Sequence, residues 1–296
     1  KISRDEYDSL KNLPMELKSP QEITGKAPYF TEMVRQYIYD KYGEDALYSG
    51  GLKVITTLDW PLQDRAEKEL RRKLDTMQAF YENNYSINNS TYTYLVTDSS
   101  RKNYYPRRVY KEINGAAVSI RNETGDILVL VGGKSFAVSK YNRAVQAQRQ
   151  PGSAFKPFVF TAAMDNGYHP SDIYFDSPIV LEIPGTKEWR PQNFDYKFMG
   201  EMTLRDGLNL SRNLIAIKLL LKISPEQAIF YANRLGITSS LRPVASLAIG
   251  TSEVRLIEIT SAYTVFPNGG IKVPYRYIMK IYDRYGNLLE DNSATQ

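Results

Sequence analysis

Cysteine is absent from this sequence of 296 residues, and histidine occurs once. Without cysteine the chain has no disulfide, no thiolate nucleophile and no zinc–thiolate site. One imidazole, that of His169, cannot build a histidine-rich metal site, and any Ser-His-Asp triad would have to use it. This histidine lies in the turn signal "NGYHPSD", where no motif for an activated serine surrounds it. We therefore predict neither a metal ion nor another cofactor.

Long apolar runs are also missing. The longest stretches, such as "IAIKLLLKI", are too short to cross a membrane, and the chain begins at Lys1 rather than at methionine. We expect a soluble piece of a longer polypeptide, with any membrane anchor upstream. The net charge of +5 and the pI near 9.0 suit an anionic envelope or a membrane surface equally well and do not by themselves indicate nucleic acid.

The composition, with 42% hydrophobic and 24% charged residues, is that of a globular protein of about two domains. In the first part, the apolar spacing predicts a helix over 28–43 that ends at Gly43, and alternation predicts a strand within 51–60. Asp59 is expected to cap the helix that follows, with Pro61 in its first turn.

Residues 81–111 are rich in asparagine, serine and tyrosine, with arginine and lysine among the tyrosines. Such a composition can bind single-stranded nucleic acid. A solvated loop between domains explains the same composition without any ligand. We favour the loop and predict no nucleic-acid partner.

From residue 113 onward, strand patterns give way to a block of helices and then to strands again. Two strands are expected within 115–133, around a turn at 122–126. Helices are expected at 153–166, 201–210, 213–222, 225–237 and 253–270, before a closing hairpin at 275–291. This order predicts an α+β fold in which helices flank an antiparallel sheet.

The stretch "QRQPGSAFKPFVF" places Ser153 three residues before Lys156, on one face of a helix that opens after Pro-Gly. A serine needs a base to act as a nucleophile, and lysine can be that base only when neutral. Burial and the positive end of a helix both lower a lysine pKa, and the same helix end offers N–H groups to an oxyanion.

The motifs are short, so the surrounding sequence decides which copy of each motif is significant. Ser-x-x-Lys occurs also at Ser99, and Ser-x-Asn occurs both at Ser86 and at Ser211–Asn213. The copies at Ser86 and Ser99 lie in the polar segment, where nothing fixes their geometry. Taken in isolation, Ser153 and Ser211 are better explained as helix N-caps, with Lys156 on the solvated surface.

Taken together, "RQPGSAFKP" and the downstream "SRN" resemble the transpeptidase domain of class A penicillin-binding proteins. The likeness extends to "APYFTEMVRQYIYDKYGEDALYSGGLKVITTLD" and "ASLAIGTSEVRLIEITSAYTVFPNGG". It implies a penicillin-binding/transpeptidase fold, of the serine β-lactamase type, preceded by a small α/β linker region. It also implies three segments: the tail of a glycosyltransferase domain at 1–26, the linker at 27–112 and the transpeptidase domain at 113–296.

The resemblance implies a role for each motif residue. Ser153 would attack D-Ala-D-Ala stem peptides to form an acyl-enzyme, and β-lactams would acylate the same oxygen. Lys156 would accept the serine proton, and Ser211 would relay a proton to the leaving amine. Asn213 would bind the substrate amide and orient Lys156, and the Ser153 backbone N–H would bind the oxyanion. The expected location is the bacterial cytoplasmic membrane, with the catalytic domain on its outer side.

One family motif, Lys-Thr/Ser-Gly, is missing. The stretch "GGKSFA" has Lys134 and Ser135, but no glycine follows and it lies before the nucleophile. We therefore expect the remainder of the polypeptide to carry this motif. A DD-carboxypeptidase or β-lactamase, in which water replaces the acceptor amine, and a β-lactam sensor that is only acylated, stay as alternatives.

Overall fold

A computed structural model of the chain describes residues 25–96, 106–182 and 188–293. Its elements are α3 (Pro28–Tyr48), β1 (Lys53–Thr56), α4 (Trp60–Asn84), β2 (Thr93–Val96), β3 (Arg107–Tyr110), β4 (Ala117–Ile120), β5 (Ile127–Val131), β6 (Gln148–Arg149), η1 (Gly152–Phe155), α5 (Lys156–Asp165), β7 (Ile173–Asp176), β8 (Gly200–Thr203), α6 (Leu204–Asn209), α7 (Asn213–Ile223), α8 (Pro225–Leu235), η2 (Ala245–Ile249), β9 (Val254–Arg255), α9 (Leu256–Tyr263), β10 (Ile278–Tyr282) and β11 (Leu288–Asp291). Helices and short antiparallel strand pairs alternate, which confirms the α+β prediction.

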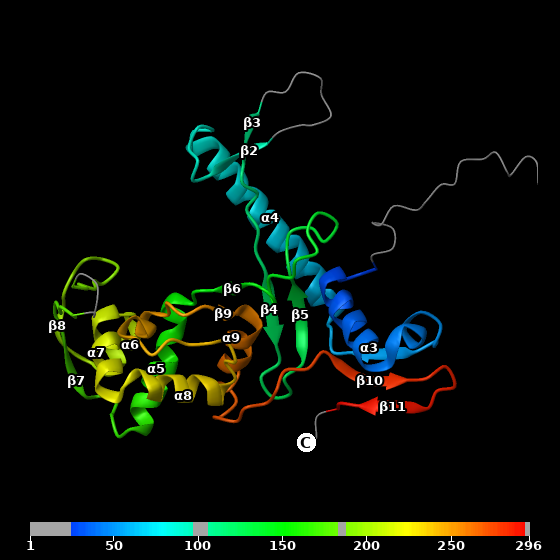
Figure 1. Ribbon diagram of the computed structural model, residues 1–296. Helices are drawn as coiled ribbons and strands as arrows, with labels where there is room; N and C mark the ends of the chain where they lie inside the picture. The colour runs from blue at the N-terminus through cyan, green and yellow to red at the C-terminus, as the bar shows by residue number, and fades with distance from the viewer. Residues whose placement is uncertain (1–24, 97–105, 183–187, 294–296) are drawn as a thin grey trace, which may run out of the picture.

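The two ends of the described chain meet in one sheet. Strand β1 pairs antiparallel with β10, and β10 pairs with β11, so the predicted closing hairpin is confirmed and lies beside α3 (Figure 1). Ile38 of α3 packs on Ile278 and Ile281 of β10, and these three side chains are buried. Within α3, Gly43 has φ +84 and breaks the helix at the predicted residue, although a further helical turn follows it.

Helix α4 begins as predicted and continues farther. An Asp59 carboxylate oxygen accepts from the Leu62 N–H at 3.1 Å, and Pro61 lies in the first turn, so the predicted cap is confirmed. Gln63, fully buried, donates to the Leu130 carbonyl and accepts from the Leu130 N–H of β5. This side chain thereby fixes α4 against the strands that precede the motif residues.

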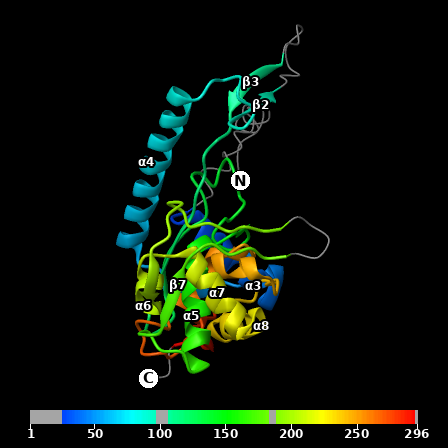
Figure 2. The ribbon, with the colours of Figure 1, turned by 90° about the vertical axis from the view of Figure 1, so that its left-hand side faces the viewer.

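The prediction of a loop over 81–111 is wrong for the part that the structure describes. Helix α4 continues to Asn84, and β2 pairs antiparallel with β3 at the far end of that helix (Figures 1 and 2). The β-branched and aromatic residues in "TYLV" and "RRVY" are the strand signal that the polar composition of the segment obscured. Ser99 and Lys102 lie outside the described residues.

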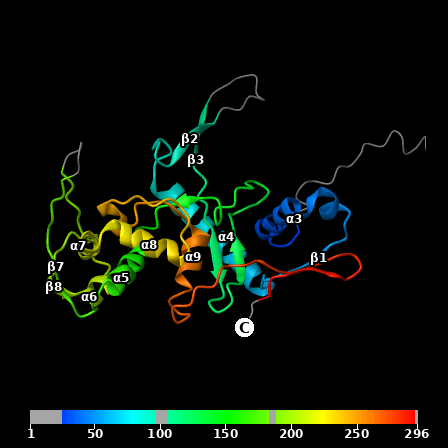
Figure 3. The ribbon, with the colours of Figure 1, turned by 60° about the horizontal axis from the view of Figure 1, so that its bottom comes forward.

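The two strands predicted within 115–133 are β4 and β5, which pair antiparallel around the expected turn. Helices α5, α7 and α8 pack into one core with η2, and Figure 3 shows these three helices side by side. The helices predicted at 213–222 and 225–237 are confirmed, and Gly236 ends the second of them. The predictions at 201–210 and 253–270 hold only in part, because β8 precedes α6 and α9 ends at Tyr263.

The strands form small sheets rather than the one continuous sheet expected. Besides the three-stranded sheet, the described ranges contain the pairs β2-β3, β4-β5, β6-β9 and β7-β8. The β6-β9 pair joins the segment before η1 to the segment before α9, and the β7-β8 pair precedes α6. The predicted site residues follow these short pairs along the chain: Ser153 lies in η1, Lys156 and Asn213 are the first residues of α5 and α7, and Ser211 lies just before α7.

Candidate active site

The amine of Lys156 lies at the centre of the site. Lys156 is the first residue of α5, and only 1% of its surface is exposed. Its Nζ lies 3.0 Å from the Ser211 hydroxyl, 2.6 Å from the Ser211 carbonyl oxygen and 2.7 Å from the Asn213 carboxamide oxygen. The structure therefore brings three of the four predicted residues together, and a solvated Lys156 is excluded.

Ser153 lies three residues before Lys156, in the 3₁₀ turn η1 that leads into α5. Its backbone carbonyl accepts from the Lys156 N–H, and the residue itself is exposed at the surface of the site. The N-cap position of α5 is Phe155 and that of α7 is Arg212. Neither Ser153 nor Ser211 is therefore a helix cap, and the alternative that assigned them that role is wrong.

Two glycines shape the turn that carries Ser153. Gly152 has φ +58, and its N–H donates to the Gly250 carbonyl at 3.2 Å. A Cβ on Gly250, whose φ is +69, would lie 2.2 Å from the Gly152 carbonyl oxygen. On the other side, the Tyr263 hydroxyl donates to the Ala154 carbonyl at 2.7 Å. Backbone contact on both sides of Ser153 thus fixes the direction in which its side chain leaves the turn.

Gly250→Ala is expected to slow acylation of Ser153 by a fluorescent penicillin about tenfold or more, because the added methyl must push the nucleophile turn away. The rate of labelling measures the effect. Gly286→Ala is a matched control, since Gly286 also has a left-handed φ but has open space around its Cβ position. Equal labelling rates for the Gly250 variant and the wild type would contradict this account of the turn.

The segment before β8 orients the second motif. The Asn213 Nδ2 donates to the Gln192 carbonyl at 3.0 Å, which leaves the carboxamide oxygen of Asn213 facing Lys156. The Asn193 carboxamide oxygen accepts from the Asn213 N–H at 2.9 Å. Sequence reasoning missed Gln192 and Asn193, because an isolated Gln-Asn pair 20 residues from the motif carries no local signal. Ser211 itself has φ +52, a conformation that directs its carbonyl to the amine.

Burial lowers the pKa of Lys156 to about 8, and the positive charge of Arg212 contributes in the same direction. A lysine with such a pKa is partly neutral near physiological pH and can accept a proton. The site thus has an exposed serine, Ser153, one helical turn from a buried amine whose lowered pKa suits a base, and the hydrogen bonds of that amine go to Ser211 and Asn213 rather than to the Ser153 hydroxyl.

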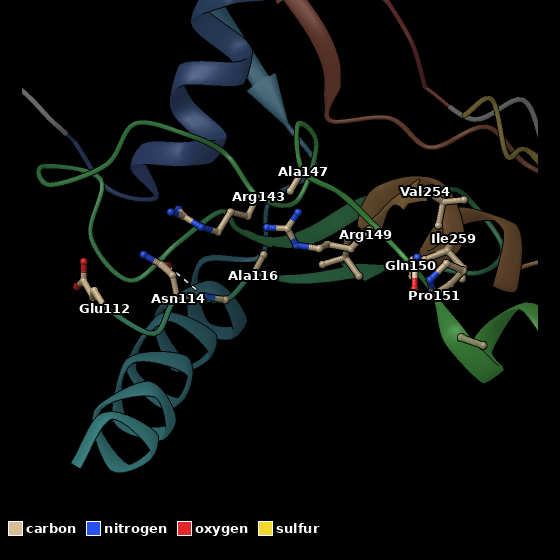
Figure 4. A pocket seen from close by; sticks show the side chains of 13 residues that line it. Glu112, Asn114, Ala116, Arg143, Ala147, Arg149, Gln150, Pro151, Val254 and Ile259 are labelled. Carbon is tan, nitrogen blue, oxygen red and sulfur yellow. Dashed lines mark hydrogen bonds between the residues drawn. The ribbon is translucent and has the colours of Figure 1, made fainter. Parts of the chain in front are cut away.

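A cavity of about 640 Å³ lies next to the nucleophile turn. Pro151 and Ala154, the residues on either side of the Gly152–Ser153 pair, line it, and so does Ile259 of α9. Arg143 and Arg149 extend along its wall (Figure 4). Glu112 lies in the same wall, so the two arginines are partly offset and the lining keeps a small positive charge next to the nucleophile turn.

His169 is not part of the arrangement around Lys156. His169 is in an exposed turn, where its Nδ1 lies 2.7 Å from the Ser171 hydroxyl. Across 25–96, 106–182 and 188–293, no three His, Cys, Asp or Glu side chains gather in a way that could hold a metal ion. Within these same ranges no helix combines the length and the apolarity that a membrane crossing needs.

Comparison with known proteins identifies the family. The model of the penicillin binding protein transpeptidase domain matches residues 115–296. Penicillin-binding protein 1A of Rickettsia conorii is 30% identical over 97% of the chain, and that of Neisseria meningitidis serogroup A is 32% identical over 90%. The crystal structure of penicillin-binding protein 1A from Haemophilus influenzae superposes with a TM-score of 0.74 over 98% of the chain, at 27% identity.

The chain spans less than half the length of these two relatives, 45% and 43%, and 53% of the crystallised protein. Its match to the family model covers the nucleophile turn, the buried lysine and the Ser-Arg-Asn segment alike. The fold predicted from the resemblance is confirmed by the structural similarity. The chain belongs to the class A penicillin-binding proteins, and residues 115–296 match their transpeptidase domain.

Proposed function

We propose that this chain carries the nucleophile half of a peptidoglycan DD-transpeptidase site. The observation that supports it is the buried amine of Lys156, which contacts Ser211 and Asn213 and lies one helical turn from the exposed Ser153. In the proposed reaction the Ser153 oxygen attacks the carbonyl between the two terminal D-alanines of a stem peptide. Neutral Lys156 takes the hydroxyl proton, and the Ser153 N–H binds the oxyanion.

The intermediate then breaks the peptide bond. The terminal D-alanine leaves as an amine after receiving a proton, and the rest of the stem peptide stays on Ser153 as an ester. An amine from a second stem peptide attacks this ester, forms the cross-link and returns the proton to the serine oxygen. A β-lactam forms the same ester, but its ring-opened acyl group stays attached to Ser153.

The hydrogen bonds of Lys156 support Ser211 as the proton relay. A neutral amine has two N–H groups and one lone pair. The Ser211 carbonyl and the Asn213 carboxamide oxygen can only accept, so they bind the two N–H groups. The Ser211 hydroxyl can accept from the protonated amine or donate to the neutral one. Of these three partners, only this hydroxyl can reverse its hydrogen bond as the proton moves.

The rate of acylation is expected to rise with pH through a midpoint of about 8. The reactive form of Lys156 is the neutral one, and a pKa of about 8 leaves roughly a tenth of it neutral at pH 7 and roughly nine tenths at pH 9. The second-order rate constant for a penicillin should therefore increase about tenfold between these values. A rate that is flat or falls over this range would contradict Lys156 as the base.

In this proposal, the rest of the polypeptide completes the transpeptidase site and carries the other parts of the enzyme. It would supply the Lys-Thr/Ser-Gly motif, the upstream glycosyltransferase and a membrane anchor that holds the domain outside the bacterial cytoplasmic membrane. Strand β4 pairs only with β5 among the described strands, and the cavity next to the nucleophile turn is open, so both leave room for further chain. The segments 1–26, 27–112 and 113–296 remain the proposed domains.

The function is tested with the full-length protein, a fluorescent penicillin and a synthetic stem peptide ending in D-Ala-D-Ala with an acceptor amine. We expect a lasting penicillin adduct on Ser153, release of D-alanine and a cross-linked product by mass spectrometry. Release of D-alanine with only hydrolysed peptide would indicate a carboxypeptidase. Rapid release of hydrolysed penicillin would indicate a β-lactamase, and an adduct without any peptide turnover would indicate a sensor.

A further inference from the structure

A buried ion pair lies directly behind the second motif. Arg212, the residue between Ser211 and Asn213, is 6% exposed, and Asp176 at the end of β7 is fully buried. One carboxylate oxygen of Asp176 accepts from Nε of Arg212 at 2.9 Å and lies 2.8 Å from Nη2. A second carboxylate, that of Asp195, lies 3.0 Å from Nη1 and is partly exposed. The planar guanidinium is thus held on two edges, which lysine cannot reproduce.

The same ion pair is connected to the start of α7 through Asn193. The other oxygen of Asp176 accepts from the Asn193 carboxamide nitrogen at 2.8 Å. The Asn193 carboxamide oxygen in turn accepts from the N–H groups of Asn213 and Leu214, at 2.9 and 3.3 Å. One continuous set of hydrogen bonds therefore runs from β7 to the backbone of Asn213, the residue whose carboxamide contacts Lys156.

Stability alone explains neither the buried ion pair of Arg212 and Asp176 nor the hydrogen bonds through Asn193. Replacing a buried ion pair by apolar side chains of similar size is often neutral or stabilising, because both charges are removed from water. Ser211, which directly precedes Arg212, has a left-handed φ, a conformation that a serine adopts only when its surroundings force it to. The forces act from both sides: Arg212 is fixed behind Ser211, and Lys156 binds the Ser211 carbonyl in front.

We propose that Arg212, Asp176 and Asn193 form a positioning unit that holds Ser211 and Asn213 against the Lys156 amine. The proposal rests on the proposed function, since it assigns these residues to the transfer of the Ser153 proton. None of the three touches the amine, so they act through Ser211 and Asn213. Arg212 adds its positive charge, which favours the neutral amine.

The charged groups around Lys156 are consistent with this assignment. Turns η1 and η2, which pack at the start of α5, contain no charged side chain. Lys218 of α7 is turned to the carbonyls of Phe175 and Ser177. The charged residues of α6, α8 and the end of α7 are on exposed positions: Arg205, Asp206, Lys222, Glu226 and Arg234. Arg212 is thus the charged neighbour, with Asp176 and Asp195 offsetting part of its field.

The test measures the second-order rate constant of acylation by a penicillin from pH 6 to 10 on the full-length protein. Arg212→Met should lower the maximal rate about 100-fold, because the second motif is displaced, and should raise the pH midpoint by about one unit. Arg212→Lys, which keeps the charge but loses the fork, and Asn193→Ala, which keeps both charges, should lower the rate about tenfold with the midpoint unchanged. The change of midpoint separates the effect of charge from that of position.

Arg276→Met is the matched control. It removes another largely buried ion pair, between Arg276 and Asp126 at the start of β5, and should lower the melting temperature without changing the rate or the midpoint. Wild-type rates and midpoints in Arg212→Met and Asn193→Ala would overturn the positioning unit. If Arg212→Met does not fold, the rates of Arg212→Lys and Asn193→Ala test the positioning unit instead. Wild-type acylation rates in both of these variants would overturn it. A wild-type protein that is never acylated overturns the proposed function instead.

Discussion

Ser153→Ala is expected to abolish covalent labelling by a fluorescent penicillin. The ester forms on the serine oxygen, and removal of that oxygen leaves no atom in η1 to hold the acyl group. The effect is complete rather than partial, because neither Lys156 nor Ser211 can replace a missing nucleophile: the amine is buried and the hydroxyl is bound to it. Gel fluorescence and the intact mass of the protein after incubation measure the result.

The sequence contains a matched control for this experiment. Ser99 is followed by Lys102 in the same Ser-x-x-Lys pattern, so Ser99→Ala changes an equivalent motif outside the described site. The fluorescent penicillin should label the Ser99→Ala variant as strongly as it labels the wild type. Labelling that persists in Ser153→Ala would remove Ser153 from the nucleophile role, and labelling lost in both variants would show that the assay reports folding rather than chemistry. Melting temperatures of the two variants distinguish these cases.

Local patterns located the four motif residues, and the resemblance to class A penicillin-binding proteins distinguished them from the copies at Ser86 and Ser99. The separation of Ser153 and Lys156 by three residues decides that they share one turn, whatever the rest of the fold does. The Asp59 cap and the helix stops at Asn166 and Gly236 are local in the same way, since each depends on neighbours within about four residues. Predictions of this kind need no knowledge of tertiary structure.

The residues that hold the motifs in place could not be found in this way. Asp176 and Arg212 are 36 residues apart in sequence, and Asn193 lies between them in a segment without regular structure. Their contacts exist only because β7 and the start of α7 pack together. The β1–β10 pairing joins Lys53 to Tyr282 and is equally invisible to a local pattern. Asp176, Asn193 and Arg212 are also buried polar side chains, and a local pattern does not reveal which polar residues are buried.

Lys156→Ala is expected to slow acylation by penicillin about 10²–10⁴-fold without preventing it, in contrast to the complete loss in Ser153→Ala. Transfer of the serine proton to a positioned base contributes a factor of this size. The oxyanion donor and the serine itself remain, so slow labelling should continue. The rate constant for labelling over hours, measured by intact mass, gives the factor.

The pH dependence of the remaining activity shows whether Lys156 is the base or only a support for its neighbours. Lys156 also binds Ser211 and Asn213, so its loss alone could slow the reaction by displacing them. If the amine is the base, the rise of the rate through pH 8 disappears in Lys156→Ala, because the group that titrates there is gone. If Lys156 only supports its neighbours, the slower reaction of Lys156→Ala keeps the wild-type pH midpoint. Lys102→Ala, from the second Ser-x-x-Lys pair, should keep both the wild-type rate and the wild-type midpoint.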